Sequence, residues 1–197
     1  MNVKPIFQTN PKIDQTNYFG YTDTFSEEEL MWIDNLKNLY PYQDAKVISN
    51  KETPENAIRK SKIKWIHYDE YSDWLYDKLK DLVIDANSQI WQFNLHSIVD
   101  SIQYTEYYEG GGHYDWHLDI GPGLINHRKI SITIQLSDPN DYEGGDLEIW
   151  SGGDFKKVEK LKGTSILFPS FLLHRVTPIT KGIRKSLVLW VGGDSYK

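Results

Sequence analysis

The stretch Arg128-Lys129-Ile130-Ser131-Ile132-Thr133-Ile134-Gln135-Leu136 decides how this chain is expected to fold. Large aliphatic side chains occupy every second position and alternate with small or polar ones. Because successive side chains of a β-strand point to opposite faces, this alternation predicts a strand with one buried apolar face. We expect the polar face, formed by Ser131, Thr133 and Gln135, to look into the interior of a barrel. A solvent-facing strand is the alternative.

The two-residue period recurs through the second half of the chain. It appears at 91–95, 102–104, 147–150, 165–168 and 186–191, in segments separated by Gly, Pro, Asn and Asp. Short strands split by turns are typical of an all-β sandwich or barrel. We therefore predict a mainly β fold with flanking helices. In one domain over 1–197, a double-stranded β-helix (jelly roll) core at 90–197 is packed by a helical flank and loops at 1–89.

The helical signals lie within the first 89 residues. One helix is expected to begin after Thr24 or Ser26, with Ser26 as its cap and acidic residues in its first turn, and to end at Pro41. A second helix is expected over about 72–87, where apolar residues recur at helical spacing opposite Asp and Lys. Both apolar stripes predict packing against the β core.

Two segments of the first half look irregular. Residues 1–23 are polar and contain prolines, so we expect an extended arm or loop without the pattern of a signal peptide. Residues 41–63 are expected to form a long loop, broken by a short strand at 46–49. Long loops in compact domains are often lids over a site, and a surface segment is the alternative.

The composition excludes several kinds of site. The 197 residues include no cysteine, so disulfides, zinc–thiolate sites, iron–sulfur clusters and a cysteine nucleophile are excluded. The net charge of −6 argues against a nucleic-acid partner, and the basic run 127–129 is expected to be a solvated edge. No apolar run approaches the ~20 residues that cross a bilayer. We expect a cytoplasmic protein with no membrane partner.

The strongest chemical signal lies in Tyr108-Glu109-Gly110-Gly111-Gly112-His113-Tyr114-Asp115-Trp116-His117-Leu118-Asp119. In a strand, His117 and Asp119 project from the same face, about 6–7 Å apart. Asp115 would share that face. A histidine from a neighbouring strand, for which His174 is the best placed, would complete two imidazoles and one carboxylate. That set is used for non-haem Fe(II) and O₂ chemistry.

Arg184 follows His174 by ten residues, across a turn that contains Pro178 and Gly182. Such a turn returns the chain into an adjacent strand, so the guanidinium can point into the same barrel as the metal. A planar guanidinium suits bidentate binding of a carboxylate, and burying it without an anion would be costly. An inward Arg184 therefore implies an anionic co-substrate, whose carboxylate Ser131, Thr133 and Gln135 could also bind. A surface arginine is the alternative.

These residues carry a resemblance to the 2-oxoglutarate/Fe(II) dioxygenase superfamily, in its prolyl 4-hydroxylase-like branch and closest to the PKHD-type hydroxylases. The matching patterns are Tyr108-x2-Gly111-x2-Tyr114-x2-His117-x-Asp119, Glu143-Gly144-Gly145-Asp146-Leu147-Glu148-Ile149 and His174-x3-Pro178-x3-Gly182-x-Arg184. The resemblance implies that His117, Asp119 and His174 bind iron and that Arg184 binds the distal carboxylate of 2-oxoglutarate. It also implies that Tyr108 helps to form the co-substrate or substrate pocket. Collagen-type enzymes mostly have Lys in place of Arg184.

The resemblance implies hydroxylation of a C–H bond with Fe(II), 2-oxoglutarate, O₂ and ascorbate as reductant, and with release of succinate and CO₂. We expect a peptidyl proline of a peptide or protein as the substrate, and a free amino acid or other small molecule is the alternative. A non-enzymatic jelly-roll binding module is the second alternative. An AlkB-like activity on nucleic acids would require a different arginine pattern and usually a basic face.

Overall fold

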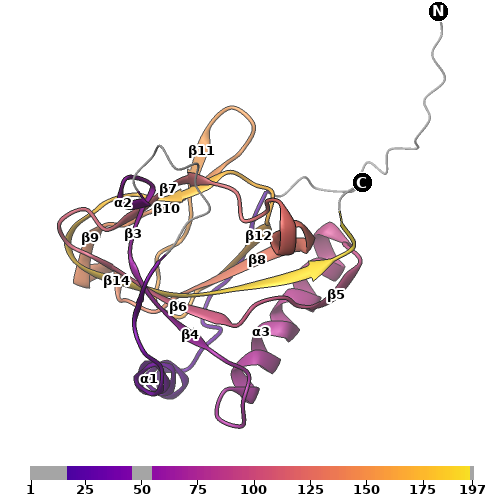
Figure 1. The fold of residues 1–197 in the computed structure, drawn as a ribbon, viewed down its shortest axis with the longest axis horizontal. Coiled ribbons are helices and arrows are strands. Elements are labelled where there is room, and N and C mark those ends of the chain that lie inside the picture. Colours follow the sequence, from indigo (N-terminus) through magenta and orange to yellow (C-terminus); the bar gives the residue numbers. More distant parts are fainter. Residues whose placement is uncertain (1–16, 46–54, 196–197) are drawn as a thin grey trace, which may run out of the picture.

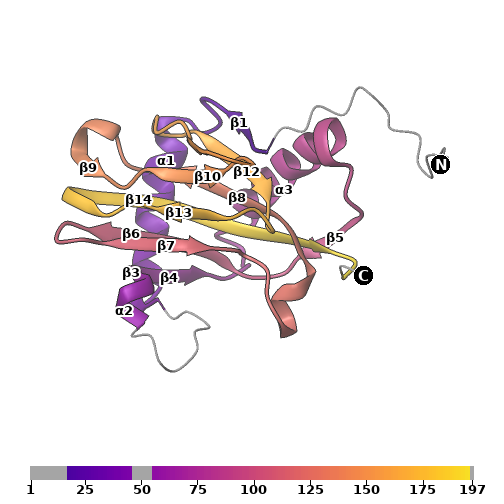
Figure 2. The same cartoon turned by 90° about the horizontal axis from the view of Figure 1, so that it is seen from above.

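The computed structural model describes residues 17–45 and 55–195. Within these residues, two antiparallel sheets lie face to face, and α1 and α3 cover the outer side of the larger one (Figure 1). The larger sheet follows the order β1-β12-β8-β14-β6-β4-β2, and β5 and β9 also pair with β14. The smaller sheet follows the order β11-β10-β13-β7-β3, and its strands β10, β13 and β7 run side by side in Figure 2. The predicted fold class is confirmed.

The bounds of the elements show how the chain alternates between the sheets. The large sheet contains β1 (Phe19–Tyr21), β2 (Gln43–Asp44), β4 (Lys62–Ile66), β5 (Leu95–Ile98), β6 (Ile102–Tyr108), β8 (Arg128–Gln135), β9 (Tyr142–Gly144), β12 (Ser165–Pro169) and β14 (Ile179–Gly193). The small sheet contains β3 (Arg59–Lys60), β7 (His113–His117), β10 (Leu147–Trp150), β11 (Phe155–Lys157) and β13 (His174–Val176). The helices are α1 (Glu27–Leu36), α2 (Glu55–Ile58) and α3 (Asp73–Ala86).

Strand β8 separates the two environments of the fold. Ile130, Ile132 and Ile134 are fully buried in the cluster that includes the apolar faces of α1 and α3. Ser131 and Thr133 line a cavity between the two sheets. The polar face of β8 therefore looks inward, as predicted, and the solvent-facing alternative is wrong.

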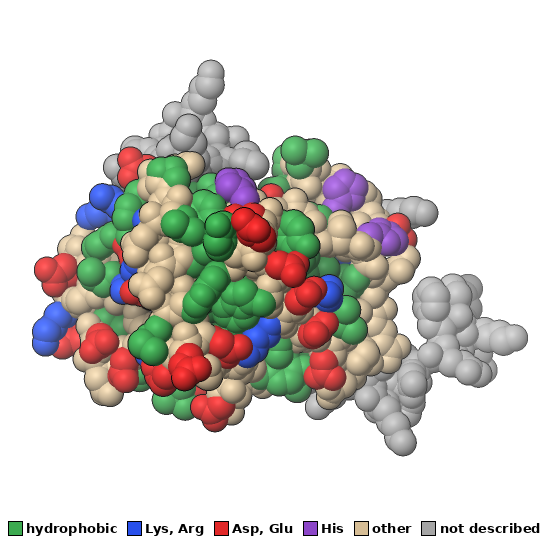
Figure 3. All heavy atoms as spheres, turned by 90° about the horizontal axis from the view of Figure 1, so that it is seen from below, with side chains coloured by type: hydrophobic (Ala, Val, Ile, Leu, Met, Phe, Trp, Pro, Cys, Tyr) green, Lys and Arg blue, Asp and Glu red, His purple; other side chains and the backbone are tan. Residues whose placement is uncertain are grey.

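Both predicted helices are present, and local chemistry explains where α1 begins. The Ser26 hydroxyl accepts a hydrogen bond from the Glu29 N–H, while the Glu29 carboxylate accepts one from the Ser26 N–H, which forms a capping box. The Glu29 carboxylate also pairs with Lys78 of α3 at 2.6 Å and so joins the two helices. Asp and Glu side chains are spread over the surface on this side of the molecule (Figure 3).

The strand predicted at 91–95 was wrong at its start. Residues Asn87–Trp91 form a π-helical turn, Gln92 adopts a left-handed φ of 53°, and β5 begins only at Leu95. The Asn87 side-chain amide donates to the Phe93 carbonyl and accepts from the Phe93 N–H, both at 2.9 Å. Trp91 and Phe93 pack against the core although neither lies in a strand, so their alternation reflects burial alone.

The helical flank also contributes strands that the sequence analysis missed. The arm predicted at 1–23 contains β1, which pairs with β12, and the loop predicted at 41–63 contains β2, β3 and the start of β4. Charged residues mask β4, because Lys62 and Lys64 interrupt its apolar pattern. The short strand predicted at 46–49 lies outside the described residues. In the described part of the chain, no helix combines the length and apolar character needed to cross a bilayer.

Replacing Ile134 with alanine should lower the free energy of unfolding by about 2–5 kcal/mol, because the truncation leaves a cavity in the core between the large sheet and the helices. Urea unfolding measures this change. Ile183→Ala on β14 is a matched control, since Ile183 is 38% exposed, and it should cost less than about 1 kcal/mol. Equal losses in the two variants would contradict the assignment of the apolar face of β8 to the core.

Candidate metal and co-substrate site

The pairing of β7 with β13 brings the predicted metal ligands together. His117 at the end of β7 lies opposite His174 at the start of β13. Asp119 follows two residues after β7 ends, and its carboxylate oxygens lie 3.6 Å from His117 Nε2 and 3.5 Å from His174 Nε2. One ligand atom from each residue lies within 4.8 Å of the others, a spacing that can hold a metal ion.

Asp119 does not share a regular strand with His117, although the sequence predicted that it would. Its N–H donates to the carbonyl of Ser170 at 3.0 Å, in the connection between β12 and β13. The Ser131 hydroxyl donates to Asp119 Oδ2 at 2.6 Å, and Ser170 Oγ lies 2.9 Å from Ser131 Oγ. Arg128 donates to the Asp119 carbonyl at 3.1 Å. These contacts fix Asp119 from two separate segments of the chain, β8 and the connection between β12 and β13.

Both histidines are oriented by backbone carbonyls. His117 Nδ1 lies 2.7 Å from the carbonyl oxygen of Asp115, and His174 Nδ1 lies 2.8 Å from that of Leu172. Because a carbonyl oxygen only accepts, each Nδ1 must carry the hydrogen, which leaves the Nε2 lone pair free for a metal. Asp115 thus acts through its backbone, while its side chain is exposed.

Electrostatics keeps His117 and Asp119 in the protonation states that a metal requires. Burial, followed by the neighbouring His174, lowers the pKa of His117 to about 3, so its imidazole is neutral near pH 7. Burial alone would raise the pKa of Asp119, but His174, His117 and the Ser131 hydroxyl outweigh it and lower this pKa to about 2. The cluster therefore presents a neutral His117 imidazole and an ionised Asp119 carboxylate.

Arg184 is buried at another part of the same cavity, and the surface alternative is wrong. Its side chain is 2% exposed, donates to Gln135 Oε1 at 3.0 Å and to Ser186 Oγ at 3.4 Å, and lies 5.6 Å from the centre of the Tyr107 ring. Among the described residues, no carboxylate forms an ion pair with it. Gln135 thus orients the guanidinium, and the charge remains available for an anion.

Backbone geometry explains why a glycine, Gly182, lies two residues before Arg184. The φ of Gly182 is +74°, and a Cβ on Gly182 would lie 2.1 Å from the carbonyl oxygen of Asp141. Gly182 lies opposite Tyr142 in the pairing of β14 with β9. Only glycine at position 182 allows the two strands to come this close. This pairing sets the start of the strand segment that carries Arg184.

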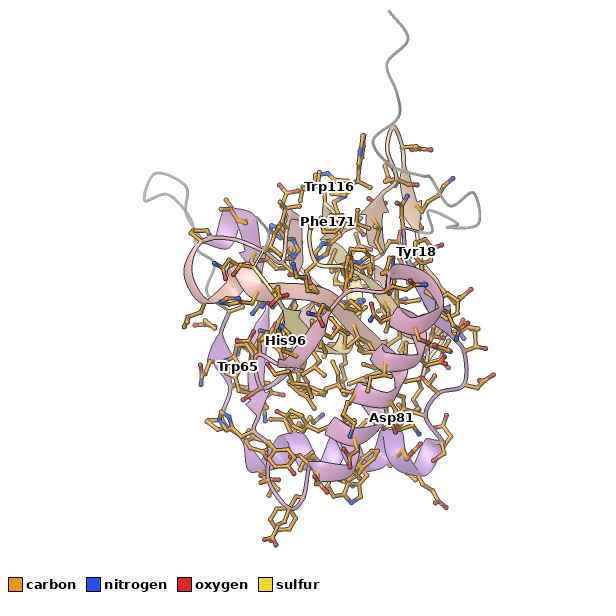
Figure 4. The ribbon with its side chains drawn as sticks, turned by 90° about the vertical axis from the view of Figure 1, so that its right-hand side faces the viewer. Tyr18, Trp65, Asp81, His96, Trp116 and Phe171 are labelled. Carbon is orange, nitrogen blue, oxygen red and sulfur yellow. The ribbon has the colours of Figure 1, made fainter. Side chains whose placement is uncertain are left out.

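A cavity of about 580 Å³ joins the metal ligands to Arg184. Side chains from both sheets line it, among them Arg59, Tyr107, Tyr114, Thr133 and Trp190. Trp116 also lines the cavity, and Figure 4 places it with Phe171 on the side of the molecule away from Asp81 of α3.

Tyr108 lies elsewhere, which corrects its predicted place in the pocket. Its hydroxyl donates to Glu106, and Lys62 lies over its ring at 5.9 Å. Neighbouring residues of β6 face opposite sides, so Tyr107, opposite Arg184 in the β6–β14 register, lines the cavity. His113 is also separate from the metal cluster, because its Nδ1 contacts the Gly111 carbonyl at the β6–β7 turn.

The basic run 127–129 is a solvated edge only at His127, and the prediction was wrong for Arg128 and Lys129. Arg128 pairs with Asp100 at 2.6 Å, lies 3.9 Å from the centre of the Trp190 ring and contacts the Asp119 backbone. Lys129 is 7% exposed, and burial lowers its pKa. Sequence reasoning also missed Ser170 and Arg59, whose contacts join segments far apart in the chain.

The donor set fits Fe(II). Two imidazoles and one carboxylate within one cavity are the ligand set of non-haem iron oxygenases, and the same cavity extends to Arg184. The carbonyl contacts of both imidazoles and the serine contacts of the carboxylate supply the outer hydrogen bonds that such ligands usually have.

Comparisons with known proteins agree with this geometry. The family model of the 2OG-Fe(II) oxygenase superfamily matches residues 102–192. A PKHD-type hydroxylase of Aliarcobacter butzleri (strain RM4018) is 30% identical over 175 residues, which are 86% of this chain and 75% of the relative. A PKHD-type hydroxylase of Teredinibacter turnerae (strain ATCC 39867 / T7901) is 38% identical over 89 residues, which are 43% of this chain and only 39% of that relative.

The fold is also that of solved prolyl hydroxylases. A prolyl hydroxylase from Trichoplax adhaerens, in complex with a hypoxia inducible factor oxygen degradation domain peptide fragment, superposes with a TM-score of 0.74. It is 21% identical, and the match covers 90% of this chain and 84% of that one. The chain therefore belongs to the 2OG-Fe(II) oxygenase superfamily, in its prolyl 4-hydroxylase-like branch.

Acidification should destabilise the metal-free protein through His117. The folded state keeps this imidazole neutral, with a pKa of about 3, whereas the unfolded chain gains a proton near pH 6.5. Stability is therefore lost as pH falls through the unfolded pKa, by about 2 kcal/mol between pH 7 and pH 5. Urea unfolding at both pH values measures it. His117→Gln should lack this component and His113→Gln should retain it; an unchanged pH dependence in His117→Gln would refute the assignment.

Proposed function

We propose that this protein is an Fe(II)- and 2-oxoglutarate-dependent dioxygenase that hydroxylates a C–H bond and releases succinate and CO₂. The observation that carries the proposal is one cavity that contains both a cluster of two histidines and one aspartate and a buried arginine without a carboxylate partner among the described residues. A metal and an anion are the two ligands that these groups require.

The protein residues divide the task between them. Iron, when bound with 2-oxoglutarate and O₂, would supply the oxidising chemistry that couples hydroxylation of the substrate to conversion of 2-oxoglutarate into succinate and CO₂. His117, Asp119 and His174 would hold the metal, and Ser131 would hold the Asp119 carboxylate in place. Arg184, fixed by Gln135, would bind the distal carboxylate of the co-substrate.

A peptidyl proline is the substrate that we propose. Its support is the PKHD-type hydroxylases among the relatives, the prolyl hydroxylase with a peptide among the similar structures, and the aromatic lining at Tyr107, Tyr114 and Trp116. Aromatic side chains offer broad apolar surfaces on which a prolyl ring can pack. A free amino acid is the alternative. Ascorbate as reductant and a cytoplasmic location stay predictions.

The activity is tested by incubating the protein with Fe(II), 2-oxoglutarate, O₂ and a library of prolyl peptides. Succinate should form in step with a peptide that gains one oxygen atom, as seen by mass spectrometry. Hydroxylation of free amino acids alone would favour the small-molecule alternative. Absence of succinate from folded, iron-loaded protein would favour a non-enzymatic binding module.

Replacing Arg184 with methionine should weaken 2-oxoglutarate binding ~10–100-fold, because a charge-assisted contact to the distal carboxylate is lost. Iron affinity should change little, since Arg184 is not a metal ligand. Calorimetric titration of each ligand separates the two effects. Arg175→Met is a matched control, because Arg175 pairs with Glu148 and lies over Trp116. Unchanged 2-oxoglutarate affinity in Arg184→Met would remove this role.

A further inference from the structure

A second buried arginine lines the cavity. Arg59 of β3 is 8% exposed, donates from Nε to Ser61 Oγ at 2.9 Å and from a terminal nitrogen to Gln103 Oε1 at 2.7 Å. Both acceptors are uncharged. Among the side chains that the structure describes, at 17–45 and 57–195, no carboxylate forms an ion pair with this guanidinium.

Arg59 lies near the end of the cavity that contains the candidate metal ligands. Arg59 lies opposite Tyr114 in the pairing of β3 with β7, and its guanidinium carbon is 4.5 Å from the centre of the Tyr114 ring. The Tyr114 ring also stacks on the imidazole of His117, with 3.4 Å between the ring centroids and 14° between the ring planes. One aromatic ring therefore links the guanidinium to a proposed iron ligand.

Arg59 and Arg184 approach the cavity from different places. Arg59 contacts Gln103 on β6, whereas Arg184 lies opposite Tyr107 on the same strand. The Arg184 guanidinium is held by Ser186 and Gln135, level with Thr105 of β6, so the two guanidinium groups are anchored about two strand residues, or ~7 Å, apart. If Arg184 binds the distal carboxylate of the co-substrate, Arg59 is placed for a different anion nearer the metal.

The charge of Arg59 indicates what that anion must be. A buried guanidinium is costly unless an opposite charge compensates it, and two neutral acceptors use only two of its five N–H donors. The planar fork of donors fits the two oxygens of a carboxylate.

We infer that Arg59 binds a carboxylate of the substrate, so that the substrate class is a prolyl compound that carries an acidic group close to the hydroxylated carbon. The inference rests on the proposed oxygenase function. The carboxylate has two possible sources: the α-carboxylate of a terminal or free amino acid, or the side chain of an adjacent Asp or Glu in a peptide.

Two matched pairs of probes test the inference on protein loaded with Mn(II) and 2-oxoglutarate. One pair is N-acetyl-L-proline and its amide; the other is N-acetyl-Pro-Asp-amide and N-acetyl-Pro-Asn-amide. Calorimetric titration should show ~10-fold or tighter binding of the acid in at least one pair, and that pair identifies the source. Equal binding of acid and amide in both pairs, or no binding of either acid, would overturn the inference.

Variants then assign the preference to Arg59. Arg59→Met should abolish the preference for the acid, and Arg59→Lys should retain part of it. Lys60→Met, the adjacent cation of β3, which donates to the Gly110 carbonyl, should keep it in full. Persistence of the preference in Arg59→Met would overturn the assignment. The wild-type comparison of acid with amide stands even where a variant fails to fold.

Binding of 2-oxoglutarate, measured before any probe is added, separates the two proposals. Wild-type protein that holds Mn(II) but no 2-oxoglutarate would overturn the proposed function itself. Wild-type protein that binds 2-oxoglutarate but shows no preference for an acid would overturn only the role of Arg59. A loss of 2-oxoglutarate affinity in Arg59→Met, without a preference for acids in the wild type, would assign Arg59 to the co-substrate and also overturn the inference.

Discussion

The pairing of β7 with β13 places His117 opposite His174, and the rest of the site depends on this register. A shift of one residue would turn one imidazole away from the other. The carbonyl groups of Asp115 and Leu172 then set both rings so that each Nε2 is free. Asp119 completes the cluster only because Ser170 and Ser131 hold it beyond the end of β7.

One face of the large sheet packs in the hydrophobic core, and the other face lines the cavity that contains the metal cluster. The isoleucines of β8 pack with α1 and α3, while the intervening Ser131 contacts Asp119 and Gln135 contacts Arg184. A single strand thus supports both the candidate metal cluster and the buried Arg184. Because its apolar face is locked in the core, the polar face is held in a fixed position relative to the small sheet.

Charge is distributed unequally in the cavity. The metal cluster carries one carboxylate, while Arg59 and Arg184 are both buried there. Hydrogen bonds to Gln103 and Gln135 orient these two guanidinium groups without neutralising them. Such a cavity favours anionic ligands, which agrees with a dicarboxylate co-substrate and an acidic substrate.

The sequence predicted the parts of the site that depend on short spacing. His117 and Asp119 are two residues apart, and a glycine turn precedes Arg184, so local geometry was enough to single them out. The sequence predicted Tyr108 in the pocket, where the structure places Tyr107. Which face of β6 points into the cavity is set by the neighbouring strands and cannot be read from β6 alone. Ser170 and Arg59 act through contacts between distant segments, and no local pattern marks them.

The central claim is that His117, Asp119 and His174 bind iron in a way that lets 2-oxoglutarate chelate the same ion. The direct test is the visible spectrum of metal-free protein titrated with Fe(II) and 2-oxoglutarate under argon. A weak charge-transfer band should appear only when both are present and should vanish in His174→Ala. Folded wild-type protein that binds neither iron nor 2-oxoglutarate, and gives no band, would contradict the account.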